Sequence, residues 1–362
     1  MNSFLCSLLR ADLRAHFQPY SSAGSEAGKA EELAFLNANE NPYPIAGLEG
    51  LNRYDVQQPP ALIQKLAETY DVKPEYVLAS RGSDESIDLL IRATCRPGAD
   101  SIMICPPTFG MYGVYATLSA INVHQVPLTD AKGTWHLAVD EIIEAARKLK
   151  PKLLFLCSPN NPTGTDFPAQ DLEHIVKSLS DVCAVVMDEA YIEFTDRESF
   201  SSKLSTYPNL IVLRTLSKAY ALAGERLGCA LSDDDDFMRF LRGCLAPYPM
   251  PKGVTQSALT ALSISAQDLD GRLANLLEQT LRISKAFTGH PRVENVYPSA
   301  ANFIFVRFQT GEDAKEFNQL CAQHHLILRD FSARPDTPGC LRISAGTQEE
   351  MDRLLEILHT FE

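Results

Sequence analysis

The sequence has no surplus of positive charge. It contains 33 lysines and arginines against 46 aspartates and glutamates, a formal net charge of −13 over 362 residues. A protein this acidic is not expected to bind nucleic acid or an anionic membrane through its overall charge. Any anion that it binds must therefore be held by a small, local group of cations.

Long apolar runs and paired cysteines are also lacking. No run approaches the roughly 18 residues that a membrane-spanning helix needs. The short apolar stretch at residues 4–9 has no preceding cation and is followed at once by Arg10, so it is not expected to be a signal peptide. The nine cysteines are scattered and include no Cys-x-x-Cys pair, which argues against a disulfide framework or a zinc knuckle. We expect a cytoplasmic protein with no membrane partner.

Several cofactor and metal patterns are missing as well. The chain has no Gly-x-x-x-x-Gly-Lys-Ser/Thr phosphate loop, and Gly110-Met111-Tyr112-Gly113 does not match the dinucleotide-binding fingerprint. The eight histidines show no metal-ligand spacing, so no metal site is expected.

The sequence does contain an alternation of strand and helix patterns. With 45% hydrophobic and 22% charged residues it has a globular composition, and its length predicts a large domain and a smaller one. Short apolar runs alternating with helical spacing predict a mainly parallel sheet covered on both faces, an α/β domain at residues 36–250. The expected strands are residues 77–80, 101–105, 123–126, 153–157, 182–188, 210–213 and 227–231.

The C-terminal part has a different pattern and predicts a small α+β domain at residues 251–362. A long amphipathic helix containing Leu269, Leu273 and Leu276 comes first. The expected elements after it are strands at 302–308, near 326–329 and at 341–344, a helix at 314–324 and a final helix from about 348. Residues 1–35 are left as an N-terminal arm.

Polar clusters stand at the ends of four predicted strands. Taken alone, each cluster has the residues that are usual in turns and helix caps. Ligands of open parallel sheets, however, bind at the carboxyl ends of the strands, so four clusters at one edge predict a shared binding site. The clusters are residues 81–85, 158–164, 188–191 and 215–218, with Arg226 soon after the last.

These clusters carry a family resemblance. Asn161-Pro162-Thr163-Gly164, Asp188-Glu189-Ala190-Tyr191 and Ser217-Lys218 with Arg226 resemble the motifs of the fold-type-I aminotransferases, which use pyridoxal phosphate. Longer strings resemble the histidinol-phosphate aminotransferases of that family, and they run in order through nearly the whole chain: residues 37–42, 158–164, 214–224, 327–330 and 339–344. The resemblance implies a homodimer in which the N-terminal arm packs with the small domain or the partner subunit.

The resemblance also implies catalytic and cofactor-binding residues. Lys218 would bond to the cofactor's aldehyde and move a proton, its neutral form favoured by Arg226 and partial burial. Asp188 would keep the ring nitrogen protonated, while Asn161 and Tyr191 would bond to the phenolic oxygen. Asp84 and Glu85 are expected to offer backbone N–H groups to the phosphate, with their carboxylates turned away. The remaining expected contacts are stacking by Phe109, phosphate or loop contacts by Ser83, Thr215, Ser217 and Arg226, and a phosphate contact by Tyr54 from the neighbouring subunit.

The implied reaction is transamination between histidinol phosphate and 2-oxoglutarate, giving imidazole acetol phosphate and glutamate in histidine biosynthesis. Arg342 would bind the substrate α-carboxylate, and Arg329 and Tyr20 are candidates for the distal phosphate. Asn39 and Asn161 complete the implied substrate contacts.

Other functions remain open at this point. An aromatic amino-acid aminotransferase or a threonine-phosphate decarboxylase of the same fold would keep Lys218, Asp188 and Arg342. A non-catalytic, cofactor-binding regulatory domain is a remoter alternative, and the intact lysine, aspartate and arginines argue against it. Two positions depart from the family pattern. Asp55 stands where proline is usual, and Glu225 replaces a neutral residue beside Arg226, with which it is placed to pair.

Overall fold

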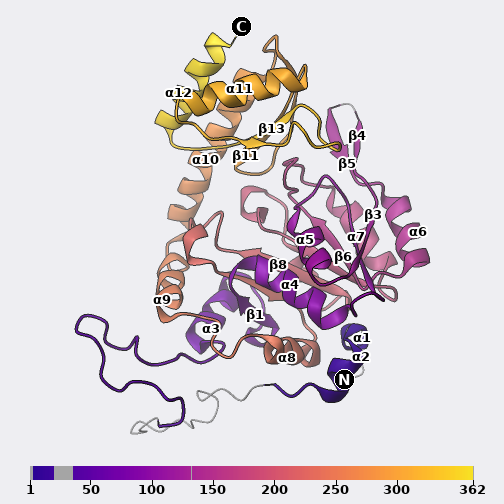
Figure 1. The fold of residues 1–362 in the computed structure, drawn as a ribbon, viewed down its shortest axis with the longest axis vertical. Helices are drawn as coiled ribbons and strands as arrows, with labels where there is room; N and C mark the ends of the chain where they lie inside the picture. The colour runs from indigo at the N-terminus through magenta and orange to yellow at the C-terminus, as the bar shows by residue number, and fades with distance from the viewer. Residues whose placement is uncertain (1–2, 20–35, 132, 362) are drawn as a thin grey trace.

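The computed structural model describes residues 3–19, 36–131 and 133–361. Its chain is organised around two sheets, joined by a long helix that Figure 1 shows running from the larger part to the smaller one. The larger sheet has the strand order β1-β9-β8-β7-β6-β2-β3. Its strands are β1 (Val77–Ser80), β2 (Ser101–Ile104), β3 (Asn122–Gln125), β6 (Leu153–Cys157), β7 (Ala184–Asp188), β8 (Leu210–Thr215) and β9 (Gly228–Leu231).

Strand direction decides where the polar clusters lie. Strands β3, β2, β6, β7 and β8 are mutually parallel, whereas β9 is antiparallel to both β8 and β1. Strand β1 therefore runs in the same direction as β8, and the carboxyl ends of β1, β6, β7 and β8 share one edge. All seven expected strands form, and the prediction of an α/β fold with a mainly parallel sheet is confirmed.

Helices cover both faces of this sheet. In β7, Val185 and Met187 enter the core on one face, while Ala184 and Val186 enter the core on the other. Fully burying such a side chain contributes about 1.5–3 kcal/mol, which explains the continuous apolar runs of these strands. One face is covered by α3 (Pro60–Thr69), α6 (Val139–Leu149), α7 (Ala169–Ser178) and α9 (Lys252–Ala261), the other by α1 (Phe4–Leu8), α4 (Gly82–Thr94), α5 (Met111–Leu118) and α8 (Asp235–Cys244). Helix α2 (Ala11–His16) follows α1.

The smaller sheet has the order β10-β11-β13-β12 and is covered by three helices. Its strands are β10 (Val293–Tyr297), β11 (Phe303–Phe308), β12 (Arg329–Asp330) and β13 (Cys340–Ser344), and the helices are α10 (Ala266–Phe287), α11 (Gly311–Gln323) and α12 (Gln348–Thr360). Its other face adds Tyr297, Phe305 and Phe331 to a core cluster of the large sheet, so the two sheets pack on each other.

Two details of this part differ from the sequence-based expectation. The strand expected near residues 326–329 begins only at Arg329, because the backbone N–H of Leu326 bonds to the carbonyl of Cys321 at 2.9 Å and ends α11. Strand β10 was not predicted, since Glu294 and Asn295 interrupt its apolar pattern.

A hairpin of β4 (Thr129–Ala131) and β5 (Thr134–His136) connects the large part to the small sheet. The Asp130 carboxylate accepts a hydrogen bond from the Tyr297 hydroxyl at 2.6 Å and pairs with Arg307 at 2.8 Å. The small sheet is thus attached to the large part by this hairpin as well as by α10.

The remaining sequence-based points concern thiols and membranes. All nine cysteines are free thiols and eight are buried, as expected for small core residues. Among the described residues, no helix has the length and apolar character needed to cross a membrane.

Candidate active site

A cavity of about 810 Å³ lies where the carboxyl ends of the large-sheet strands face the small sheet. That volume is typical of a ligand-binding cleft. Twelve of the predicted site residues line it: Ser83, Asp84, Phe109, Asn161, Asp188, Tyr191, Thr215, Ser217, Lys218, Arg226, Arg329 and Arg342. In the described part of the chain, no group of three or more His, Cys, Asp or Glu side chains is placed to bind a metal ion.

Four predicted site residues are not part of this cavity. The Glu85 carboxylate turns away and bonds to the Arg81 guanidinium at 2.5 Å. Tyr54 stacks on Tyr248 with ring centroids 4.1 Å apart, and Asn39 is exposed. Both lie on residues 36–58, a segment that Figure 1 shows extending away from the body of the chain. Tyr20 lies outside the described residues.

Asp188 ends β7 as a buried carboxylate with two hydrogen-bond donors. The Tyr112 hydroxyl donates to Oδ2 at 2.6 Å and the Ala190 N–H to Oδ1 at 3.1 Å. Burial raises the pKa of Asp188 to about 6 despite these bonds. No ion pair of Asp188 is found among the described residues, so a cationic group in the cavity would find an unpaired, desolvated anion there.

Lys218 follows β8 and is half-buried beside Asp188 and Tyr191. Its Nζ lies 5.5 Å from the centroid of the Tyr191 ring. Burial lowers the pKa of Lys218, and the neighbouring Arg342 guanidinium lowers it further. The sequence-based expectation named Arg226 as the responsible cation, but Arg226 contributes less than Arg342. Lys218 is therefore placed to be neutral more often than an exposed lysine.

Arg342 reaches the cavity from β13. Its Nη1 donates to the Asn161 Oδ1 at 2.6 Å, and its Nε is buried without a partner. Arg329 of β12 stands directly opposite Arg342 in the strand register. Two like charges opposite each other are unfavourable unless an anion lies between them. The pair is therefore suited to hold an anion at the small-sheet wall.

The start of α4 offers a second group of donors suited to an anion. Among the described residues no side chain caps this helix at Arg81, and the first N–H groups of a helix have no intrahelical partner. Gly82 has φ +73°, a backbone conformation that favours glycine, and a Cβ there would lie 2.7 Å from the Arg226 Nη2 and displace that guanidinium. Arg226 Nη1 donates to the Ser217 hydroxyl at 3.4 Å.

The acidic residues near this site do not all behave as expected. Asp84 lines the cavity and its Oδ2 accepts from Arg226 Nη2 at 3.0 Å, so its carboxylate does not turn away. Glu225 does not pair with Arg226, because it accepts a hydrogen bond from the Ser257 hydroxyl at 3.0 Å. Of the two carboxylates in question, only Asp84 competes for Arg226.

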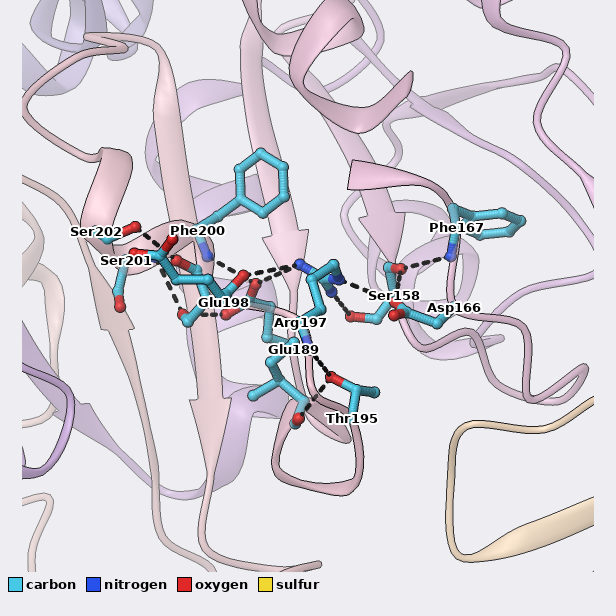
Figure 2. A network of polar contacts seen from close by, with 12 residues as sticks. Ser158, Asp166, Phe167, Glu189, Thr195, Arg197, Glu198, Phe200, Ser201 and Ser202 are labelled. Atoms are coloured by element: carbon cyan, nitrogen blue, oxygen red, sulfur yellow. Dashed lines mark hydrogen bonds and ion pairs between the residues drawn. The ribbon is translucent and has the colours of Figure 1, made fainter. Parts of the chain in front are cut away.

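A buried network of charged groups supports the loop after β6 (Figure 2). The Arg197 guanidinium donates to the Ser158 carbonyl at 2.9 Å, to Asp166 at 3.0 Å and to Glu189 at 3.3 Å. It ties the loop that carries Asn161 to the end of β7. Sequence reasoning did not find Arg197 or Tyr112, because neither stands in a cluster at a strand end. The only local signal for Tyr112 was its place three residues after Phe109, at the start of a helix.

Comparisons with known proteins match these observations. The sequence model for aminotransferase class I and II matches residues 33–358. The histidinol-phosphate aminotransferase of Xylella fastidiosa (strain 9a5c) is 43% identical over 354 residues, 97% of this chain and 95% of that protein. That of Stenotrophomonas maltophilia (strain R551-3) is 41% identical over 357 residues, 97% of this chain and 96% of that protein.

A solved structure shows the same fold. The histidinol-phosphate aminotransferase of Sinorhizobium meliloti, crystallised in complex with pyridoxal-5′-phosphate, aligns with a TM-score of 0.77 and 24% identity. The alignment covers 86% of this chain and 84% of that one.

Proposed function

The chain belongs to the class I and II aminotransferases, and we propose that it transfers an amino group between histidinol phosphate and 2-oxoglutarate, giving imidazole acetol phosphate and glutamate. The observation that carries the substrate assignment is the opposed pair Arg329 and Arg342 in the cavity wall. A substrate with an anionic group next to its reacting carbon fits there. The full-length similarity to histidinol-phosphate aminotransferases supports the same reaction.

The cofactor of this family is pyridoxal phosphate, and the residues of the cavity fit it. The uncapped start of α4 with Ser217 and Arg226 suits its phosphate, and the desolvated Asp188 suits a protonated ring nitrogen. Lys218, with its lowered pKa, suits the aldehyde. Phe109 offers a ring for stacking, and Asn161 and Tyr191 would bind the phenolic oxygen.

The protein's part in the reaction is to position groups and to move a proton. When bound, pyridoxal phosphate supplies the carbonyl that exchanges the amino group and a ring that accepts the electrons released at Cα. The Lys218 amine takes the proton from Cα of the amino donor. When the amino group passes to the 2-oxo acid, the same amine returns a proton to the Cα of the new amino acid. Asp188, held by Tyr112, keeps positive charge on the ring nitrogen. Arg342 orients the substrate so that its Cα–H faces Lys218.

The two amino donors present different anions to the same wall. Glutamate carries an α-carboxylate, which the planar guanidinium of Arg342 binds with two parallel hydrogen bonds. Histidinol phosphate has no carboxylate, and its phosphate is attached to Cα through one methylene and one oxygen. Arg329, directly across from Arg342, is placed to bind that longer group. Tyr20, the other candidate, lies outside the described residues.

The test is to mix the purified holoenzyme with single amino donors and follow the absorbance of the bound cofactor. Histidinol phosphate and glutamate are expected to convert it to the amine form, and 2-oxoglutarate to restore it. Phenylalanine, tyrosine and threonine phosphate represent the alternative activities. Faster conversion by an aromatic amino acid than by histidinol phosphate, or release of carbon dioxide from threonine phosphate, would replace the proposed reaction.

We also propose that the enzyme is a cytoplasmic homodimer. The support is the segment at residues 36–58, which exposes large apolar side chains and extends away from the body of its own chain over part of its length (Figure 1). Leu36, Tyr43 and Ile45 are 94%, 81% and 73% exposed. Such a surface favours burial against a second copy, with Tyr54 directed to the neighbouring active site. The same proposal includes an arm at 1–35, a large domain at 36–250 and a small domain at 251–362.

A further inference from the structure

Three guanidinium groups surround one aromatic ring in the small-sheet wall of the cavity. The Cζ atoms of Arg329, Arg334 and Arg342 lie 5.9, 5.3 and 6.0 Å from the ring centroid of Phe331. All four residues line the cavity. In a protein with a net charge of −13, this is a strong local concentration of positive charge.

Arg334 is not explained by the site described so far. Arg329 and Arg342 are opposed in neighbouring strands, whereas Arg334 belongs to the loop after β12. Hydrogen bonds within the loop hold the backbone of Arg334 in place. The Arg334 N–H donates to the Phe331 carbonyl at 3.0 Å, and the Arg334 carbonyl accepts from Thr337 N–H at 3.2 Å. Its side chain is 47% exposed and lines the cavity from this fixed point.

The acidic groups near Arg334 bind it only loosely. Its Nε is 3.6 Å from the Asp336 Oδ1, and both side chains are partly exposed, so the pair contributes little to stability. Asp330, the other carboxylate of this wall, accepts a hydrogen bond from the backbone N–H of Ser332 at 2.7 Å. The Arg334 guanidinium therefore keeps donors for a ligand.

The two amino donors differ in how many cations they can use. A carboxylate has one charge and two oxygens, and a single guanidinium binds both oxygens. A phosphate monoester has a charge of about −1.5 to −2 at pH 7 and three terminal oxygens. Arg342 alone is enough for the carboxylate, while the phosphate has further oxygens and further charge for Arg329 and for a third guanidinium.

We propose that Arg334 is a specificity-determining residue that contacts the phosphate of the phosphorylated donor and not the α-carboxylate of glutamate. This inference rests on the proposed function. Arg342 bonds to Asn161, whereas Arg334 lines the cavity from the loop after β12. It is thus placed to act on the outer part of the longer anion.

The first test compares the two half-reactions in the holoenzyme. In Arg334→Gln, kcat/KM for histidinol phosphate is expected to fall by about threefold to tenfold, because the lost contact is charge-assisted but partly exposed. The kcat/KM for glutamate is expected to change by less than about twofold. Arg334→Lys keeps the charge but not the planar guanidinium, so its kcat/KM for histidinol phosphate is expected to lie between those of the wild type and Arg334→Gln. The control is Arg353→Gln. Arg353 is a partly exposed arginine of α12 that bonds to the His324 carbonyl and is not among the residues that line the cavity.

A second variant tests whether Arg334 binds the substrate or only forms an ion pair with Asp336. Asp336→Asn removes the carboxylate that competes for Arg334, so KM for histidinol phosphate is expected to fall. If Arg334 served only to pair with Asp336, this variant would instead show the same losses as Arg334→Gln. Inhibition of the glutamate reaction by inorganic phosphate measures binding of the anion. Its inhibition constant is expected to rise in Arg334→Gln by the same factor as kcat/KM for histidinol phosphate falls.

The outcomes also separate this inference from the proposed function. A wild-type enzyme that turns over histidinol phosphate, combined with equal losses on both donors or no loss in Arg334→Gln, overturns the role of Arg334 alone. A wild-type enzyme that does not turn over histidinol phosphate overturns the proposed function and this inference with it.

Discussion

The Tyr112 hydroxyl and the Asp188 carboxylate, 76 residues apart in sequence, share a hydrogen bond of 2.6 Å at the floor of the cavity. The phenol comes from the first turn of α5 and the carboxylate from the end of β7. Tyr112 is itself fully buried and stacks on Phe155 of β6, with ring centroids 4.7 Å apart. Asp188 is therefore held in one orientation while its charge remains poorly solvated.

This arrangement predicts that Asp188 reduces the stability of the cofactor-free protein at neutral pH. Burial raises the pKa of Asp188 to about 6, so the folded protein binds this proton more tightly than the unfolded chain. Stability from this group is present below the unfolded pKa and is lost as pH rises through about 6. Above that pH the buried charge costs up to about 3 kcal/mol.

Asp188→Asn removes that cost and keeps an oxygen to accept from Tyr112. The cofactor-free variant is expected to exceed the wild type in unfolding free energy at pH 8, with the difference gone at pH 4. Its transamination rate is expected to fall by at least about a hundredfold, since the amide supplies no charge to the ring nitrogen. Urea unfolding at both pH values measures the first effect. An amide variant that is less stable at pH 8 would contradict the argument.

Lys218 is expected to carry the cofactor. Borohydride reduction of the holoenzyme followed by peptide mapping should place the label on Lys218, because its pKa is lowered and it stands beside Asp188 in the cavity. Lys218→Ala is expected to lose at least about a thousandfold in rate. Lys315→Ala serves as the control, since Lys315 is an exposed residue paired with Glu312 on α11. A label on any other lysine refutes the assignment.

Arg197 is expected to be a major contributor to stability. Arg197→Gln would leave Glu189, which is fully buried, without its closest cation and would remove the contacts to Ser158 and Asp166. The expected loss is about 2–4 kcal/mol of unfolding free energy. Arg147→Gln is the matched control, because Arg147 also donates to a carbonyl, that of Ser178, but from an exposed position. Equal effects of the two substitutions in urea unfolding would show that the network contributes nothing beyond a surface contact.

The sequence predicted the parts of the fold that are buried on both sides. Strands β1 and β6 were predicted to the residue, because a short, mostly apolar run between turn residues has few alternatives. Strand β10 and the β4–β5 hairpin were missed. Their residues are partly exposed and carry polar side chains, so their pairing depends on the contacts between the two sheets rather than on local pattern.

Part of the candidate site was likewise predicted from the sequence and part was not. Which residues share the sheet edge was predicted from the polar clusters at the ends of strands expected to be parallel, and both signals are present in the sequence. The opposed pair Arg329 and Arg342 and the bond from Arg342 to Asn161 depend on how the small sheet packs on the large one. No local signal fixes that packing. This also explains why the sequence assigned the effect on Lys218 to Arg226, which is nearby in the chain, and not to Arg342.

Tyr54 is expected to act in the active site of the neighbouring subunit. Mixing refolded Tyr54→Ala and Lys218→Ala subunits would give hybrid dimers with one site that has both residues intact. Activity of roughly a quarter of the wild type is expected from the mixture, although each parent is weakly active or inactive. Sedimentation velocity run in parallel reports the assembly. A fully active monomer, or no recovery in dimers that have exchanged subunits, would remove Tyr54 from the site.

Arg329 is expected to distinguish phosphorylated from unphosphorylated donors more strongly than any other single arginine of the wall. It stands directly across from Arg342, and no ion pair with Asp330 is present in the described part of the chain. Losing a charge-assisted contact to a desolvated phosphate costs about 1.5–3 kcal/mol, or roughly tenfold to a hundredfold in kcat/KM. Arg329→Ala should therefore impair histidinol phosphate far more than phenylalanine or tyrosine, which bind through their α-carboxylate. Steady-state kinetics on the three donors, with Arg353→Ala as the control, measure the difference. Equal losses would mean that Arg329 does not bind the phosphate, and an aromatic amino-acid aminotransferase would then become the better assignment.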